Sequence, residues 1–482
     1  MGIDKIIDTA FEPISHAVAS VIFYSVPLMG LEIKLVLVWL VLAAIFFTVY
    51  LGFINIRCFG HAIEVLRGKY DNKNADGEIN RFQALMTSLS GTVGLGNIAG
   101  VAVAISVGGP GAAFWMAVMG LFGMSTKFVE VTLGVKYRQH GSKKHPEAIS
   151  GGPMYYLRSA FERLHKPQMG KFMAGLFAVC CIGGTVGAGA LFQANQAYQQ
   201  ALIVSGGNAG FLADKGWLFG VFMAILVGLV IIGGIQWIAA VASRVVPVMA
   251  ITYIIAGFVV IGLHYTAIPD ALGTIVEMAL YPQAGIGALM GALLMGVQRA
   301  TFSNEAGLGS SAIAHSAVKT DVPISQGMVG MLGPFIDTVV ICMVTALVIV
   351  ISGTYVEGSG IEGVELTSRA FASGISWFPY VLSATVFLFA YSTMISWSYY
   401  GLKCATYLFG EYDIVENFYK LLFCLFIIIG SSTQLSNIIL FTDAMIFAMA
   451  IPNIIGLYLL APEVKTDLKV YLKKLQAVRT KY

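Results

Sequence analysis

The sequence predicts an all-α polytopic membrane protein with about 11 transmembrane helices. Of its 482 residues, 57% are hydrophobic and only 11% are charged, whereas soluble domains usually carry about 25% charged residues. The mean hydropathy of +0.80 indicates the same class, and apolar stretches of bilayer-spanning length recur along the chain. These observations exclude a single soluble globule, a nucleic-acid-binding domain and a disordered chain.

Each predicted span is a stretch of about 20 mostly apolar residues, the length that crosses the hydrocarbon core of a bilayer. In chain order the predicted spans are 33–54, 84–107, 112–135, 172–202, 217–236, 245–266, 285–315, 328–352, 377–401, 418–432 and 439–460. The stretch 11–30 is apolar too, but Pro13, His16 and Pro27 interrupt it, so we expect residues 1–30 to form an interfacial N-terminal segment.

Lysine and arginine predict the orientation in the cell membrane, because cytoplasmic loops are enriched in both. Most of the 29 basic side chains fall on one side of the predicted spans, chiefly in segments 55–83, 136–171 and 461–482. In this topology Arg244 lies in a short cytoplasmic loop between the fifth and sixth spans, and the polar segment 353–376 lies outside. We therefore expect an extracellular N-terminus and a basic cytoplasmic tail over 461–482.

Two predicted spans are interrupted by glycine and polar residues near their middle. The sequence SGTVGLGNIAG occupies 90–100 in the second span, and TFSNEAGLGSS occupies 301–311 in the seventh. Because lipid cannot satisfy unpaired backbone groups, irregular backbone at this depth must line a cavity or be buried in protein. The breaks are five spans apart, which predicts inverted five-helix repeats over 84–266 and 285–460, with 33–54 as an extra first helix.

The ends of broken helices favour particular ligands. Free N–H groups at the start of a half-helix suit a carboxylate, and free carbonyls at the end of one suit an ammonium group or a small cation. Close helix packing through small residues accounts for the glycines, but not for Asn97, Asn304 and Glu305 at the breaks. A zwitterionic amino acid bound together with Na⁺ matches both kinds of helix end.

Several motifs give a family resemblance. The sequence VGLGN at 93–97, the turn GGPGAAF at 108–114 and the pair Glu130 and Gly134 resemble the first two helices of sodium-coupled amino-acid symporters with the leucine-transporter fold. The run QRATFSNEAGLGSSAIAHSA at 298–317 and the number of spans are similar to the alanine or glycine:cation symporter family, over nearly the full length. The resemblance implies that fold and Na⁺-coupled transport of small neutral amino acids.

The resemblance also implies a substrate site, made of Thr92, Leu95, Gly96, Asn97, Gln193, Phe302 and Trp397. Backbone N–H groups of the first break would hold the substrate carboxylate, beside a polar side chain of the fourth span. Gln193 is preferred there by its depth in the span, and Gln196 is the alternative. Phe302 and Trp397 would leave room for a methyl group or a hydrogen, and the alternative for both is ordinary helix packing.

The implied Na⁺ ligands are the carbonyls of Ser90 and Val93 and the hydroxyls of Ser392 and Thr393 in the ninth span. Na⁺ is the expected co-transported ion, and no organic cofactor is expected. Without the resemblance, hydroxyls in an apolar helix usually bond back to the preceding turn.

Several further ionisable residues lie inside predicted spans. We expect Lys127, Glu130, Arg299 and Glu305 to brace the second break rather than to bind an ion. Asp337 in the eighth span has three open interpretations: a second cation site, a proton carrier or a buried hydrogen-bonded side chain.

The sequence therefore predicts a symporter that couples inward Na⁺ movement to alanine or glycine uptake by alternating access. Its expected partners are a small neutral amino acid, Na⁺ and the lipid bilayer, with no nucleic acid. Two alternatives remain: proton coupling through Asp337 or Glu305 on the same fold, and an amino-acid-gated channel or sensor without transport. An enzyme is disfavoured, because the sequence has no HExxH, GxSxG or phosphate-loop motif.

Overall fold

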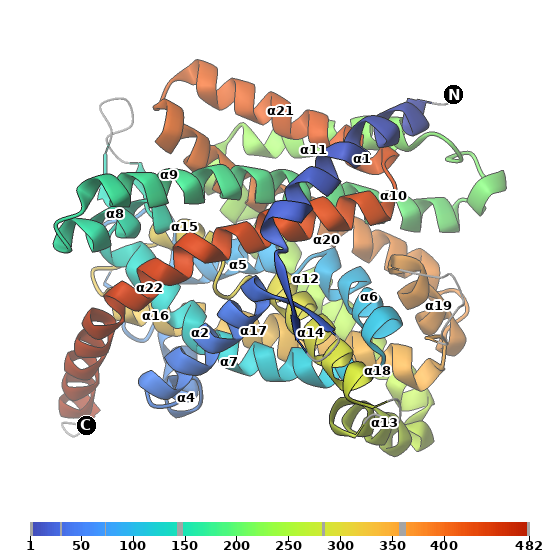
Figure 1. Ribbon diagram of the computed structural model, residues 1–482, viewed down its shortest axis with the longest axis horizontal. Coiled ribbons are helices and arrows are strands. Elements are labelled where there is room, and N and C mark those ends of the chain that lie inside the picture. Colours follow the sequence, from blue (N-terminus) through green and yellow to red (C-terminus); the bar gives the residue numbers. More distant parts are fainter. Residues whose placement is uncertain are drawn as a thin grey trace.

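The computed structural model describes residues 3–28, 31–72, 74–141, 148–281, 285–355 and 363–479. Within these ranges most of the chain is helical (Figure 1). Two short antiparallel hairpins occur between helices, β1 (Ser25–Leu28) with β2 (Leu31–Lys34) and β3 (Gln139–His140) with β4 (Ile149–Ser150).

The helical elements include short 3₁₀ turns (η1, η3 and η4) and two π-helical segments (η2 and η5). In chain order they are α1 (Ile3–Ile22), α2 (Leu35–Tyr50), α3 (Ile54–Arg57), α4 (Phe59–Leu66), α5 (Arg81–Thr92), η1 (Leu95–Asn97), α6 (Ala99–Gly108), α7 (Gly111–Lys136), α8 (Pro153–Arg163), α9 (Pro167–Gly184), η2 (Thr185–Leu191), α10 (Phe192–Val204), η3 (Gly207–Ala209), α11 (Gly216–Ile231), α12 (Gly234–Leu263), η4 (Tyr265–Ala267), α13 (Ile268–Leu280), α14 (Ile286–Asn304), α15 (Ser310–Ser316), α16 (Pro323–Gly330), α17 (Leu332–Pro334), η5 (Phe335–Cys342), α18 (Met343–Ser352), α19 (Val364–Gly374), α20 (Phe378–Phe409), α21 (Asp413–Ser432) and α22 (Leu435–Arg479).

Among the described residues, seven helical stretches are long and apolar enough to cross a membrane. The bent pair of α5 with η1–α6 gives an eighth. Predicted spans 33–54, 217–236 and 285–315 coincide with the shorter helices α2 and α11 and with the interrupted pair α14–α15. The protein is thus a multi-pass membrane protein in which the predicted spans fall on helices.

The predicted boundary between the fifth and sixth spans is wrong. α11 ends at Ile231 and α12 begins at Gly234, whose φ of +65° allows the tight turn between them. Arg244 therefore lies inside α12 and not in the cytoplasmic loop that we expected. The polar side chains of Gln236, Ser243 and Arg244 in the first turns of α12 obscured its apolar pattern.

Amphipathic helices lie between predicted spans, among them α13 and α19. α19 occupies part of the polar segment 353–376, and its Val364, Leu366 and Phe371 side chains are buried. Residues 356–362 of that segment lie outside the described residues.

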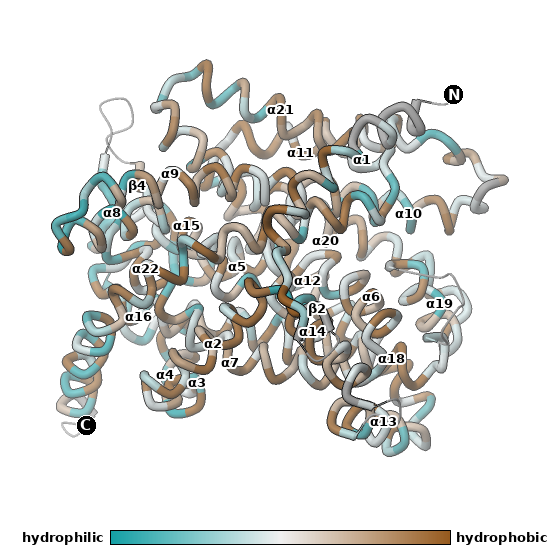
Figure 2. The backbone as a smooth tube through the Cα atoms, viewed as in Figure 1, coloured by the Kyte–Doolittle hydropathy of each residue, from teal (hydrophilic) through white to brown (hydrophobic). Residues whose placement is uncertain are grey.

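The interrupted helices lie among longer, continuous ones (Figure 1). α5 packs against α12 and α20, while α14 packs against α6 and α7. The π-helical segment η2 is surrounded by α10, α20, α21 and α22. In contrast, α11, α12 and α21 expose apolar side chains such as Leu229, Ile255 and Leu421, which suits a surface in contact with lipid. Much of α21 has the colour of hydrophobic residues in Figure 2.

The longest helix, α22, crosses the molecule, and its C-terminal end projects from it (Figure 1). The predicted interfacial segment forms α1 and the β1–β2 hairpin, and α1 packs along α22 and α21. The predicted tail 461–482 continues α22 as far as Arg479. There, Glu463 and Asp467 both form ion pairs with Lys136 at the end of α7.

Candidate functional site

The first predicted break separates α5 from η1 and α6, and bends the span by 57°. Val93 is the C-cap residue of α5, and its N–H still bonds to the Leu89 carbonyl at 2.6 Å. The side-chain oxygen of Asn97 accepts the Gly94 N–H at 3.1 Å, so Asn97 closes the irregular turn on itself. All residues of this break are buried.

Two glycines allow other helices to approach this break closely. A Cβ atom on Gly94 would lie 2.4 Å from Thr393 Oγ1 and 3.2 Å from Gln193 Oε1. A Cβ atom on Gly96 would lie 3.1 Å from the ring of Phe302. The backbone of the first break therefore meets side chains of α10, α14 and α20 directly, where any larger residue would push them apart.

The first break also meets an amide from α10. The Leu95 N–H donates to Gln193 Oε1 at 3.1 Å, and Gln193 Nε2 donates to the Ala188 carbonyl in η2 at 3.0 Å. Gln196 lies elsewhere, because its side chain bonds to Asn195 and to the Val364 N–H. The structure thus places Gln193, and not Gln196, at the break.

Aromatic side chains enclose the same region. The indole N–H of Trp397 donates to the Gly91 carbonyl at 3.1 Å, and its side chain packs so tightly on Gly189 that a Cβ there would come within 2.4 Å. Phe302 lies between Gly96 and Phe192, with 5.1 Å between the two phenyl centroids. The Thr92 hydroxyl, at the end of α5, turns back to Leu89 at 3.4 Å.

Of the four predicted cation-ligand atoms, two come together between α5 and α20, the Ser90 carbonyl and the Thr393 hydroxyl. The Thr393 hydroxyl donates to the Ser90 carbonyl at 2.9 Å, and the Ser90 hydroxyl donates to the Ser392 carbonyl at 2.6 Å. The Ser392 hydroxyl bonds back to Phe389 at 3.1 Å. Val93, the fourth, lies at the end of α5 and is fully buried. These are neutral oxygens, the donor type that suits a small monovalent cation.

The second break follows α14 and is held in left-handed backbone at Glu305 (φ +56°), Gly307 (+92°) and Gly309 (+84°). The Glu130 carboxylate from α7 accepts the Gly309 N–H at 2.9 Å and the Asn453 side-chain amide at 2.7 Å. The same amide donates to the Gly307 carbonyl at 2.9 Å. Glu130 therefore braces the second break, as predicted.

Lys127 and Glu305 complete this brace. Lys127 donates to Ser311 at the start of α15 at 2.6 Å and lies 4.0 Å from the Glu130 carboxylate. The Glu305 carboxylate accepts from the Ser310 hydroxyl. Both side chains thus contact the first turn of the half-helix that follows the break.

Asp337, the residue left open by the sequence, connects the two breaks. It lies in the π-helical segment η5, and its carboxylate accepts from the Asn97 amide of the first break. It also accepts from the Ser303 hydroxyl beside the second break at 2.6 Å and from Thr338 at 2.8 Å. A charged group is thus surrounded by polar groups from both interrupted helices.

We expected Arg299 to brace the second break, but it does not. Its guanidinium pairs with Asp443 of α22, and it lies 5.2 Å from the centre of the Phe302 ring. Asp443 was not among the predicted site residues, although an acidic residue inside the apolar span 439–460 is a visible signal of a functional position.

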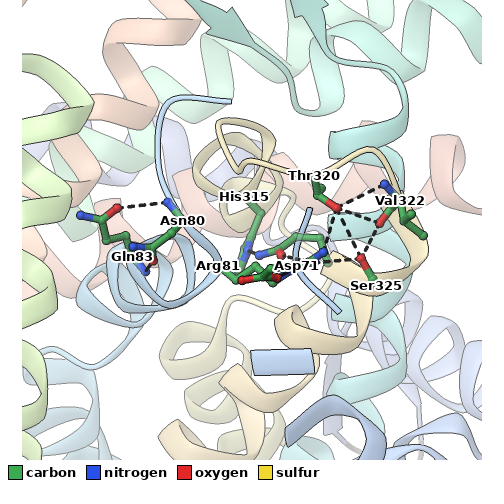
Figure 3. Close-up of polar contacts among 9 residues, drawn as sticks. Asp71, Asn80, Arg81, Gln83, His315, Thr320, Val322 and Ser325 are labelled. Atoms are coloured by element: carbon green, nitrogen blue, oxygen red, sulfur yellow. Dashed lines mark hydrogen bonds and ion pairs between the residues drawn. The ribbon is translucent and has the colours of Figure 1, made fainter. Parts of the chain in front are cut away.

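A polar cluster fixes the start of α5 on the other side of the break (Figure 3). Arg81, only 4% exposed, donates to Asp71 at 2.5 Å and to Ser325 at 2.8 Å. Its remaining N–H groups reach Thr320 at 3.0 Å and Gln326 at 3.2 Å. We call these five residues the Arg81 cluster. It ties α5 to α16 and to the segment that precedes α16.

Comparison with known proteins points to one family. A sequence model described as the sodium:alanine symporter family matches residues 17–482. The chain is 39% identical over 438 residues to the sodium/alanine symporter AgcS of Methanococcus maripaludis, which is 90% of this chain and 93% of that protein. It is 32% identical to the probable sodium/glutamine symporter GlnT of Bacillus subtilis, over 92% of this chain and 89% of that protein.

Solved structures extend the comparison to the fold. The crystal structure of MhsT in complex with L-phenylalanine matches with a TM-score of 0.52, at 15% identity. The match covers 80% of this chain and 89% of that one, and it shows a common fold.

Proposed function

Because the chain belongs to the sodium:alanine symporter family, we propose that it couples inward Na⁺ movement to the uptake of alanine and glycine by alternating access. The family and its relatives are transporters, and this protein is a transporter and not an enzyme. The observation that carries the proposal is the geometry of the first break. There the backbone of the interrupted helix, at Gly94 and Gly96, lies directly against the side chains of Gln193, Thr393 and Phe302.

The proposed substrate site uses the backbone of this break. The substrate carboxylate would accept hydrogen bonds from the backbone N–H groups around Thr92, Leu95 and Gly96. In the structure, Gln193 Oε1 accepts the hydrogen bond from the Leu95 N–H. A reoriented Gln193 side chain would then offer its Nε2 hydrogens to the carboxylate. Asn97 would hold the backbone of the break in place.

Steric volume supports a small substrate. Trp397 and Phe302 are almost fully buried beside the break and would form opposite walls of the pocket. A methyl group or a hydrogen would fit between them, whereas a branched side chain would require one of the rings to move.

The proposed Na⁺ site comprises Ser90, Val93, Ser392 and Thr393. Na⁺ there would join α5 to α20 and order the break before the amino acid binds. Each Na⁺ that moves inward would contribute about 2.3 kcal/mol per 100 mV of membrane potential, in addition to its concentration gradient.

Asp337 supports a second candidate mechanism. A carboxylate in contact with Asn97 and Ser303 could bind a second cation or carry a proton between the two breaks. Proton coupling would make uptake follow the pH gradient, and Asp337→Asn would abolish that dependence.

The decisive experiment is uptake of radiolabelled alanine into proteoliposomes, with Na⁺ or K⁺ outside and the pH clamped. We expect accumulation only under an inward Na⁺ gradient. Equal uptake in K⁺ that follows the pH gradient would replace Na⁺ by the proton. Binding without accumulation under either gradient would identify a channel or sensor.

A further inference from the structure

A second polar cluster lies on the side of the site opposite the Arg81 cluster. It contains Lys34 from the end of β2, Gln298 and Arg299 from α14, and Asp443 from α22. We call these four residues the outer cluster. Phe302 lies between the outer cluster and Gly96 of the first break. The outer cluster therefore lies next to the proposed substrate site without being part of it.

The hydrogen bonds of the outer cluster are incomplete. One oxygen of Asp443, Oδ2, accepts from Gln298 Nε2 at 2.7 Å and from Arg299 Nη2. Lys34 donates to Gln298 Oε1 at 3.3 Å. Among the described residues, Arg299 Nε and Nη1 and the other Asp443 oxygen, Oδ1, have no hydrogen-bond partner. Arg299 is 1% exposed and Asp443 is 2% exposed.

The charges of the outer cluster do not balance either. Two basic side chains, Lys34 and Arg299, face a single carboxylate in the part of the chain that the structure describes. A buried guanidinium that leaves two of its three nitrogens without acceptors is costly, because each unpaired donor keeps its desolvation penalty. An anion would supply both the missing acceptor and the missing negative charge.

From these observations we infer that the outer cluster is a binding site for a small anion, held chiefly by Arg299. Two sources share this chemistry: chloride from the medium, and the carboxylate of an amino acid that has not yet reached the first break. An amino acid would in addition place its ammonium group within reach of an acceptor such as Asp443 Oδ1, which chloride would not. This inference extends the proposed transport function, but anion binding is measured without any gradient.

The test is equilibrium binding of radiolabelled chloride and, separately, of radiolabelled alanine to the purified protein. The first variant is Arg299→Gln. The second is the double variant Arg299→Gln/Asp443→Asn, which removes both charges and so leaves no unpaired carboxylate to unfold the protein. Arg369→Gln is the matched control, because Arg369 is exposed on α19 and pairs with Glu365 of the same helix.

We expect saturable chloride binding that the double variant weakens about tenfold or more and the control leaves unchanged. If chloride does not bind, we expect a second alanine per chain that the same double variant removes. The first result identifies an inorganic anion, and the second identifies the incoming amino acid. Competition of alanine with chloride would show that one site accepts both.

The inference is overturned if neither probe detects a site that depends on Arg299. That outcome would leave the proposed transport function intact, because Na⁺-driven uptake is measured in a separate experiment. Conversely, chloride binding to a protein that shows no uptake would support the anion site and contradict the transport proposal.

Discussion

Trp397 and Thr393 lie one turn apart on α20, so one helix face presents both to the first break. Their side chains donate to consecutive carbonyls of α5, those of Gly91 and Ser90. The same two contacts would therefore serve different tasks: the hydroxyl completes the proposed cation site, and the indole forms one wall of the proposed pocket. Single substitutions should separate these tasks.

Thr393→Ala should raise the Na⁺ concentration for half-maximal uptake by about tenfold, because one neutral ligand is lost. Substrate preference should not change. Thr385→Ala is the matched control, since Thr385 lies on the same helix and its hydroxyl bonds back to the Val381 carbonyl of the preceding turn. Loss of uptake with an unchanged Na⁺ affinity would refute the site.

Trp397→Phe should improve uptake of larger neutral amino acids relative to alanine, by about tenfold, because a smaller ring leaves more room. Competition of unlabelled leucine with radiolabelled alanine measures this ratio. Trp237→Phe is the control, because Trp237 is exposed on the lipid-facing side of α12. An unchanged ratio would place Trp397 outside the pocket.

At the scale of elements, the two interrupted helices are held by different means. The first break is shaped by close approach at Gly94 and Gly96, and the second by three left-handed residues and the Glu130 carboxylate. Glycine is therefore required for space in one helix and for backbone conformation in the other.

Gly94→Ala should reduce uptake by about tenfold or more, because its Cβ would collide with Thr393 and Gln193. Gly100→Ala provides the control on the same span, since a Cβ there has no atom within 4 Å. Uptake normalised to the amount of protein in the membrane distinguishes them. Equal activity of both variants would show that the break tolerates a side chain.

Glu130→Ala should destabilise the protein by about 1–3 kcal/mol, because the Gly309 N–H loses its acceptor. Glu130→Gln keeps an oxygen at that position and should retain most of the stability. The midpoint of thermal unfolding in detergent measures both, with the exposed Glu277→Ala as control. If Glu130→Ala unfolds at the wild-type temperature, the brace is not structural.

These elements also show what the sequence could predict. The breaks were visible because glycine and polar residues inside apolar spans are a local pattern, and the depth of Gln193 followed from its position in one helix. The partners of Arg299 and Asp337 were not visible, because Asp443 and Asn97 reach them only through tertiary packing. The short turn before α12 was missed because only residues 232–233 separate α11 from α12, and polar side chains early in α12 obscured its apolar pattern.

At the scale of the whole molecule, polar clusters lie on both sides of the proposed site. The Arg81 cluster holds α5 on one side, and the Arg299–Asp443 pair holds α14 to α22 on the other. Alternating access would require each to open in turn while the other stays closed.

Arg81→Ala should favour the state open to the predicted cytoplasmic side, because α5 would lose its contacts with Thr320, Ser325 and Gln326. Labelling of Ser88→Cys by an impermeant thiol reagent in inside-out vesicles should become several-fold faster. Arg67→Ala, at an exposed position, is the control. An unchanged labelling rate would mean that the cluster does not restrain α5.

The helix α22 has a mechanical consequence. Its 45 residues, at about 1.5 Å each, follow a path of roughly 68 Å, which changes direction before its C-terminal end (Figure 1). Along it lie Asp443 of the outer cluster, Asn453 at the second break, and Glu463, which pairs with Lys136. Proline removes a helical hydrogen bond at Pro452 and at Pro462, so a movement near Asp443 reaches the C-terminal end only if the helix does not bend further at these two positions. A fluorescent probe on the last turn of α22 would therefore report how far a movement near Asp443 is transmitted along the helix.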